Sequence, residues 1–230
     1  MPIEDFHKLY VELDPSSKIT KSHTRVTANS LPRNEVAYVY KDFGKDYFKD
    51  IIHLFEIFIG TYDANSECVL YGVENNLGDY AQCTAAGLAG FHALIINTEN
   101  KRYLYFKDND SHSDSNATIG INTLYYPKIT RVGTTVSMVI YTDAARTNIL
   151  DTVSITTSAE GLRYLYPLMG DSADQADQIF NGYSQNYDLQ EGHPYTKGGT
   201  YLGSMNYGDG THLRSSNNGN KDNLIGTCYQ

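Results

Sequence analysis

The sequence lacks the features that mark several large classes of protein. It contains no run of about 18 consecutive apolar residues, so we expect no transmembrane helix. The first residues show no basic start followed by an apolar stretch, so we expect no signal peptide. Basic residues are few, with 18 Lys and Arg against 27 Asp and Glu and a net charge of -9. This balance argues against sequence-independent nucleic-acid binding, which needs a basic surface.

Cysteine is scarce and odd in number, and its three positions are Cys68, Cys83 and Cys228. An odd number of cysteines does not form a disulfide framework. The chain has no CxxC pair, so we expect no zinc site formed by cysteines. Three reduced thiols are therefore the favoured interpretation. The alternative is a bridge between Cys68 and Cys83, which would leave Cys228 to link two chains.

Tryptophan is absent, whereas tyrosine occurs 20 times. Tyr, Thr and Val favour strands, and the clearest pattern in the chain is the two-residue alternation typical of a half-buried strand. Residues 135–141 alternate apolar and polar side chains, and residues 149–157 do so again after a polar turn. We expect residues 162–166 to form the third strand of the same antiparallel meander.

A further strand is predicted at residues 53–59, which is the most apolar of the set. It should lie near the centre of a sheet, with His53, Phe55, Ile57 and Ile59 on its buried face. Residues 91–96 and 102–106 are separated by turn formers and predict a hairpin. Ten to twelve such strands without a long helix indicate an all-β sandwich with less than about a tenth of its residues helical.

The composition changes near residue 190, which suggests two parts. Residues 1–190 form the expected sandwich, and residues 191–230 form an arm rich in Gly, Asn and Ser. Such a segment cannot bury enough apolar surface to fold by itself. We expect it to become ordered by assembly with other subunits, through a set of spaced anchors: Tyr201, Met205, Tyr207, Leu213 and Cys228.

Several strings in the first part resemble one family of domains. They are RNEVAYVYKDFG at residues 33–44, IYTDAARTNILDT at residues 140–152 and RYLY at residues 163–166. With shorter matches between them, the resemblance covers roughly residues 8–190. The family comprises concanavalin A-like, laminin-G-like jelly-roll domains of phage and environmental sequences. It implies a two-sheet antiparallel jelly-roll sandwich, and the matching strings are structural rather than catalytic.

Related folds include β-glucanases, which place Glu-x-Asp-x-x-Glu on one strand. The nearest match here is Glu12, Asp14 and Ser17, in which serine replaces the last carboxylate and Pro15 interrupts the strand. No GxSxG or HExxH motif occurs. We therefore expect a protein without enzymatic activity.

One group of residues is a candidate for sugar binding, because a tyrosine ring offers a flat apolar face with a polar tip. It comprises Tyr71, Asn75, Asn76, Asp79 and Tyr80. Tyr71 stands where the family resemblance implies tryptophan. Chance clustering is the alternative in a chain with this many tyrosines.

Acidic and histidine residues offer weaker candidates. Asp108, Asp110 and Asp114 could hold a calcium ion, although the EF-hand spacing fails and a solvated loop is the favoured interpretation. No other cofactor is indicated. His53 and His92 lie in apolar strands and are expected to be structural histidines with satisfied hydrogen bonds.

The absence of catalytic motifs, the polar arm and the family resemblance together favour a virion structural protein. We expect a capsid decoration, turret or fibre subunit of a phage or virus, made in the host cytoplasm and displayed on the virion surface. Its partners would be copies of itself and other virion proteins, with no nucleic acid or membrane. The alternative is a carbohydrate-binding lectin-like module, and a glycoside hydrolase is a third, weaker alternative.

Overall fold

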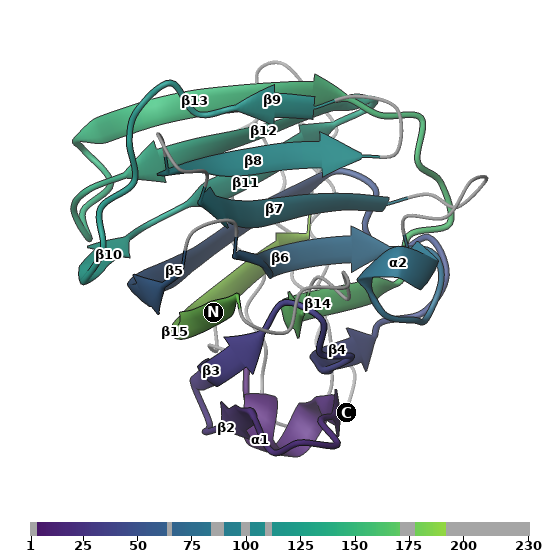
Figure 1. Cartoon of the computed structure of the whole chain (residues 1–230). Coiled ribbons are helices and arrows are strands. Elements are labelled where there is room, and N and C mark those ends of the chain that lie inside the picture. The colour runs from purple at the N-terminus through teal and green to yellow at the C-terminus, as the bar shows by residue number, and fades with distance from the viewer. Residues whose placement is uncertain are drawn as a thin grey trace, which may run out of the picture. The chain divides into compact units, whose positions relative to one another are not determined.

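The computed structural model shows an all-β protein made of two antiparallel sheets (Figure 1). It describes residues 4–63, 66–83, 90–97, 102–108, 112–170 and 178–191, without the side chains of 62, 94–97, 102–108, 112, 114 and 191. Within these ranges the helices are α1 (Phe6–Leu9) and α2 (Tyr80–Cys83). This low helix content agrees with the prediction from the sequence. Neither helix is long and apolar enough to cross a membrane.

The first sheet has seven strands that come from both halves of the chain. Their spatial order is β1 (Val11–Leu13), β4 (Tyr38–Asp42), β14 (Tyr164–Gly170), β6 (Glu67–Glu74), β7 (Gly90–Asn97), β8 (Arg102–Asp108) and β9 (His112–Asp114). The pairing of β7 with β8 is the predicted hairpin. The pairing of β4 with β14 brings together segments that are more than a hundred residues apart in sequence.

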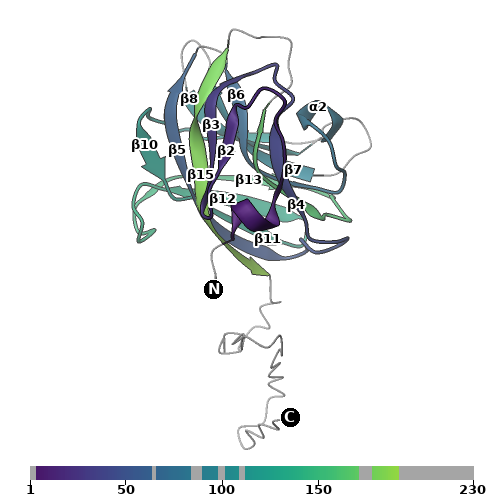
Figure 2. The same cartoon turned by 90° about the horizontal axis from the view of Figure 1, so that it is seen from below.

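The second sheet has eight strands, including the short β10 (Thr123–Tyr125), which pairs with β5 beside the main path. The spatial order of the others is β13 (Ile149–Thr156), β12 (Thr135–Tyr141), β11 (Lys128–Val132), β5 (Ile51–Tyr62), β15 (Ile179–Glu191), β3 (Arg25–Pro32) and β2 (Ile19–Lys21). Strand β5 therefore lies at the centre, as its apolar sequence predicts. Figure 2 shows β15 between β5 and β3.

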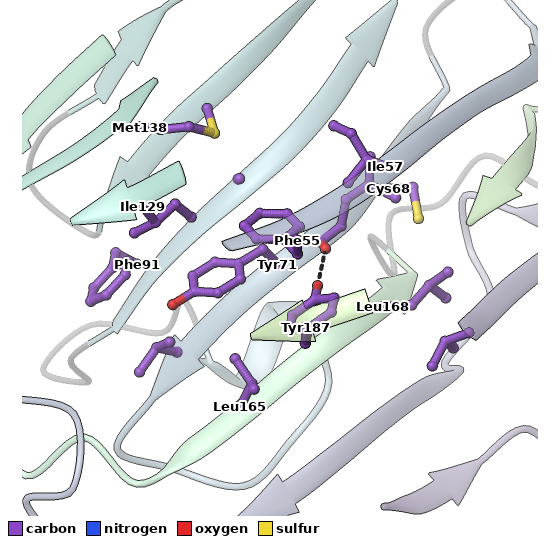
Figure 3. Close-up of a cluster of buried hydrophobic side chains, with 14 of the residues drawn as sticks. Phe55, Ile57, Cys68, Tyr71, Phe91, Ile129, Met138, Leu165, Leu168 and Tyr187 are labelled. Carbon is purple, nitrogen blue, oxygen red and sulfur yellow. Dashed lines mark hydrogen bonds between the residues drawn. The ribbon is translucent and has the colours of Figure 1, made fainter. Parts of the chain in front are cut away.

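The core lies between the two sheets and is rich in aromatic rings. His53, Phe55, Ile57 and Ile59 all face it and are at most 1% exposed, which confirms the predicted buried face of β5. The Phe55 ring stacks on the rings of Tyr71 and Tyr187, with centroids 5.1 and 4.9 Å away (Figure 3). The Tyr187 hydroxyl donates to the Leu70 carbonyl at 2.8 Å, so the buried phenol keeps a hydrogen-bond partner.

The predicted meander is only partly correct. Strands β11, β12 and β13 follow one another in the second sheet, and Val136, Met138 and Ile140 are buried as expected. The third predicted strand belongs instead to the first sheet, where β14 lies between β4 and β6. Residues 157–163 make this crossing, and alternation alone cannot distinguish a strand that pairs with its predecessor from one that joins the opposite sheet.

The structure also decides between interpretations that the sequence left open. Residues 4–14 contain both the helix α1 and the strand β1, and Asp5 caps the helix by accepting the Lys8 amide at 3.1 Å. Cys68 and Cys83 are both buried, and no disulfide bond joins them. They belong to two separate apolar clusters.

Candidate functional site

A second apolar cluster lies on the outer face of the seven-stranded sheet, away from the core between the sheets. Its buried members are Val69, Tyr80, Cys83, Tyr166 and Met169, and its half-buried members are Tyr38, Tyr40 and Tyr164. It forms because β4 and β14 each carry tyrosines two residues apart, which places both rings of a strand on one face. We call Tyr38, Tyr40, Tyr164 and Tyr166 the tyrosine cluster.

Tyr166 is the centre of the tyrosine cluster. Its ring centroid lies 5.8 Å from that of Tyr38 and 6.1 Å from that of Tyr40. Tyr40 in turn lies 6.1 Å from Tyr164, in an edge-to-face arrangement. Aromatic pairs with such separations attract one another by about 0.5–1.5 kcal/mol, so the rings support each other's orientation. The half-buried outer rings form a partly exposed aromatic surface over β4 and β14.

The loop after β6 and the helix α2 border this surface (Figure 1). The Tyr166 hydroxyl accepts the Gly78 amide at 3.2 Å, and the Cys83 thiol donates to the Gly78 carbonyl at 3.5 Å. Asp79 caps α2 by accepting the Gln82 amide at 2.8 Å. These bonds fix the loop of residues 75–79 against the tyrosine cluster.

Burial changes the acidity of several groups here. Desolvation raises the pKa of the Cys83 thiol to about 12, with Glu74 adding to the effect. The pKa of the Tyr166 phenol is raised for the same main reason, and that of Tyr38 is raised by desolvation and by the nearby Tyr40 and Asp79. The thiol and both phenols are therefore protonated near neutral pH, and Cys83 is a poor nucleophile.

A buried Glu74–His92 pair lies on the same face. Glu74 Oε1 contacts His92 Nε2, while Glu74 Oε2 and His92 Nδ1 have no hydrogen-bond partner among the described atoms. Two glycines make room for the pair, because a Cβ at Gly90 would lie 2.0 Å from Glu74 Oε2 and one at Gly72 would lie 2.8 Å from the His92 ring. Desolvation raises the pKa of Glu74, although His92 opposes this shift.

Charged side chains border the tyrosine cluster at the end of β4. Arg163 Nε donates to Asp42 Oδ1 at 2.9 Å, and its guanidinium carbon lies 5.0 Å from the centroid of Tyr164. Hydrogen bonding to Arg163 lowers the pKa of Asp42. The arrangement on this face is therefore an aromatic surface with a hydrogen-bonding rim.

The predicted sugar-binding residues are only partly brought together. Asn75, Asn76 and Asp79 are half-buried in the loop beside the tyrosine cluster, and Tyr80 is 8% exposed on α2. The assignment of Tyr71 is wrong, because Tyr71 is 0% exposed in the core between the sheets, where it cannot offer its ring to a ligand. A bulge in β6 between Val69 and Tyr71 turns this side chain inward.

The predicted metal residues cannot be judged from their side chains. Asp110 lies outside the described residues, and Asp108 and Asp114 are described by their main chain at the ends of β8 and β9. Among the side chains that are described, no group of three or more His, Cys, Asp or Glu could hold a metal ion. The predicted assembly residues Tyr201, Met205, Tyr207, Leu213 and Cys228 all lie outside the described ranges.

The two histidines expected to be structural differ in the structure. His53 Nδ1 lies 2.7 Å from the Tyr71 hydroxyl in the core, so its role is structural as predicted. His92 faces the other way and leaves Nδ1 without a partner among the described atoms. In the glucanase-like string, Asp14 has a structural role, since its carboxylate accepts the Lys18 and Ile19 amides.

Sequence reasoning missed the tyrosine cluster and the Glu74–His92 pair. A signal for the former was present, because the YVY string of residues 38–40 and the YLY string of residues 164–166 each place two tyrosines on one face. The pairing of β4 with β14, which joins these strings, carries no local signal.

Comparisons with known proteins place the fold but not the family. No family model matches the chain, and no curated protein matches it. A Saccharomyces cerevisiae protein of unknown function has a TM-score of 0.57 at 9% identity, over 80% of this chain and 97% of its own. The Ca²⁺/Man3GlcNAc-bound exoplasmic/lumenal domain of VIP36 has a TM-score of 0.52 at 7% identity, over 80% of this chain and 84% of its own.

A polysaccharide lyase of family 18 is also similar, with a TM-score of 0.53 at 5% identity over 81% of this chain and 96% of its own. An alginate lyase of Alteromonas sp. 272 gives 0.51 at 4% identity, with the same coverage of both chains. Lectin and lyase domains of this kind are concanavalin A-like jelly-roll sandwiches, and the two antiparallel sheets described above confirm that fold for this chain. At these identities the similarity is one of fold alone.

Proposed function

We propose that this chain is a carbohydrate-binding, lectin-like protein whose ligand binds on the outer face of the seven-stranded sheet. The tyrosine cluster is the observation that carries the proposal. Tyr38, Tyr40 and Tyr164 are half-buried and fixed by mutual contacts, so a sugar ring can pack on them with little loss of side-chain entropy.

Polar groups beside the cluster suit a ligand with many hydroxyls. Asn75, Asn76 and Asp79 line the loop that is bonded to Tyr166 and Cys83. Amide and carboxylate groups at the edge of an aromatic surface can give orientation and specificity to a sugar. The similar structures support the proposal, since one has Man3GlcNAc bound and others are polysaccharide lyases.

We propose binding rather than catalysis at this face. Both side chains of the Glu74–His92 pair are almost fully buried, and Cys83 has a raised pKa. A general base must come within hydrogen-bond reach of the proton it removes. In the described conformation neither Glu74 nor His92 is open to a ligand, which favours a binding role.

The virion role stays a prediction that the comparisons do not support. It rested on the absence of catalytic motifs, on the family resemblance and on residues 191–230, most of which lie outside the described part of the chain. No similar structure named above carries a virion protein in its title. The two roles are compatible, because a surface protein of a virion can bind glycans.

Glycan binding can be tested with single tyrosine variants. A broad glycan array should first identify a ligand, and calorimetry should then show that Tyr40→Ala and Tyr164→Ala each weaken binding by about 0.5–1.5 kcal/mol, or about two- to tenfold. Tyr141→Ala is the matched control, because Tyr141 is half-buried on a strand of the other sheet. An array without binding above background would reject the proposal, as would equal losses in all three variants.

A further inference from the structure

We propose that the tyrosine cluster takes an uncharged glycan and discriminates against polymers of uronic acid. This inference rests on the proposed function and adds the class of ligand. It follows from the charges of the side chains around the cluster, and it would distinguish this chain from the alginate lyases that share its fold.

The cation that contacts the ring of Tyr164 is already neutralised. Arg163 makes two hydrogen bonds to the Asp42 carboxylate through Nε and Nη2, so the guanidinium and the carboxylate together carry no net charge. Two-pronged pairing of this kind is the geometry in which arginine recognises a carboxylate. A uronate would have to compete with Asp42 for that guanidinium.

The remaining charges on this side favour the negative sign. Asp79 lies close enough to Tyr38 to contribute to its raised pKa, and it has no cation partner among the described contacts. At the rim, Lys45 and Asn75 both lie about 3.9 Å from where a Cβ of Gly161 would be, and Asn75 donates to the carbonyl of Glu160. Lys45 and Glu160 add one charge of each sign.

The buried pair adds no positive charge that is free to meet a ligand, since the His92 ring contacts the Glu74 carboxyl and is at most 2% exposed. Among the described side chains named here, Asp79 is therefore the charge that no cation offsets, since Lys45 and Glu160 cancel each other. The whole chain has the same bias, with a net charge of -9.

A uronate polymer carries one carboxylate on each sugar ring. On this face those carboxylates would lose hydrating water and would be repelled by the negative charge of Asp79. An uncharged sugar meets neither obstacle. Its hydroxyls can donate to Asp79 and exchange hydrogen bonds with Asn75 and Asn76, while its apolar ring face packs on a tyrosine.

The experiment compares matched oligosaccharides by calorimetry with the full chain. The uncharged probes are oligosaccharides of mannose, glucose, xylose and galactose, and the charged probes are alginate and galacturonate oligomers of the same length. At least one uncharged probe should bind, with a Kd that changes less than about twofold between low and high salt. Every uronate probe should bind at least about tenfold more weakly.

Two variants test the role of Asp79. Asp79→Asn keeps a good helix-capping residue. It should weaken the binding of the uncharged probe about two- to tenfold, because one carboxylate oxygen that accepts hydrogen bonds is lost. It should also reduce the ratio between the Kd of the uronate probes and the Kd of the uncharged probe. Glu56→Gln is the control, because Glu56 lies on β5 of the other sheet and bonds to Gln185. Glu56→Gln should change neither the affinity for the uncharged probe nor the ratio of the two Kd values.

The possible failures can be told apart. A uronate probe could bind as tightly as any uncharged probe and lose its affinity at high salt. That result would overturn the proposed class of ligand but would still support glycan binding. Unchanged discrimination in Asp79→Asn overturns the electrostatic explanation. Absence of binding to every probe, charged or uncharged, overturns the proposed function and this inference with it.

Discussion

Replacing Phe55 with alanine should lower the free energy of unfolding of the sandwich. Phe55 is 1% exposed on β5, and its ring stacks on the rings of Tyr71 and Tyr187, which belong to opposite sheets and also stack on each other. The variant Phe55→Ala therefore removes apolar burial and two stacked contacts at once.

The expected loss follows from these contacts. Full burial of a phenylalanine side chain contributes about 1.5–3 kcal/mol, and each stacked aromatic pair adds about 0.5–1.5 kcal/mol. The sum is about 2.5–6 kcal/mol, a range that contains the usual cost of about 3–5 kcal/mol for Phe→Ala in a core. Phe58→Ala on the same strand should cost about 1–3 kcal/mol, because Phe58 is half-buried on the opposite face and its one stacked contact among the described side chains is with Tyr183.

Urea unfolding followed by far-ultraviolet circular dichroism gives both free energies. Tyrosine fluorescence provides a second probe, since the chain has 20 tyrosines and no tryptophan to obscure them. A loss below about 1 kcal/mol in Phe55→Ala would show that Phe55 is outside the core. Equal losses in the two variants would refute the assignment of opposite faces.

The remaining predictions concern pH and the end of the chain. Burial lowers the pKa of His53 from 6.5 to about 3, so the unfolded chain binds a proton that the folded protein does not. The free energy of unfolding should therefore fall as the pH drops from 6.5 towards 3. In His53→Gln the fall over that range should be smaller. Parallel plots of unfolding free energy against pH for the two proteins would contradict this. Truncation after Glu191, where β15 ends, should leave the thermal midpoint of unfolding unchanged within a few degrees; an unfolded product would show that residues 192–230 belong to the core.

Local alternation predicted much of the sandwich because burial on one face of a strand repeats every second residue. Strands β5 and β12 were found in this way with the correct buried side chains. The same rule failed at β6, where all residues after Glu67 are buried and a bulge changes which side chains face the core. Tyr71 was chosen as a sugar-binding candidate for its place beside Asn75 and in the family resemblance, and nothing in the local sequence shows the bulge that buries it.

The candidate site was harder to predict because it depends on pairing between distant strands. The strings around Tyr38 and Tyr164 each indicated a strand with tyrosines on one face. Nothing local indicates that these strands are neighbours, or that Glu74 and His92 would meet across two glycines. The loop of residues 75–79 was recognised as a candidate, but the rings beside it were not.

The position of β15 has a consequence for the synthesis of this protein. The last described strand lies between β5 and β3, so the second sheet remains divided until residue 191 has left the ribosome. Before that, the edges of β5 and β3 that β15 will occupy have no partner in this sheet, and open strand edges promote association with other chains. Folding can therefore finish only after translation of the sandwich is complete, and a stall within residues 179–191 would leave a nascent chain that depends on chaperones.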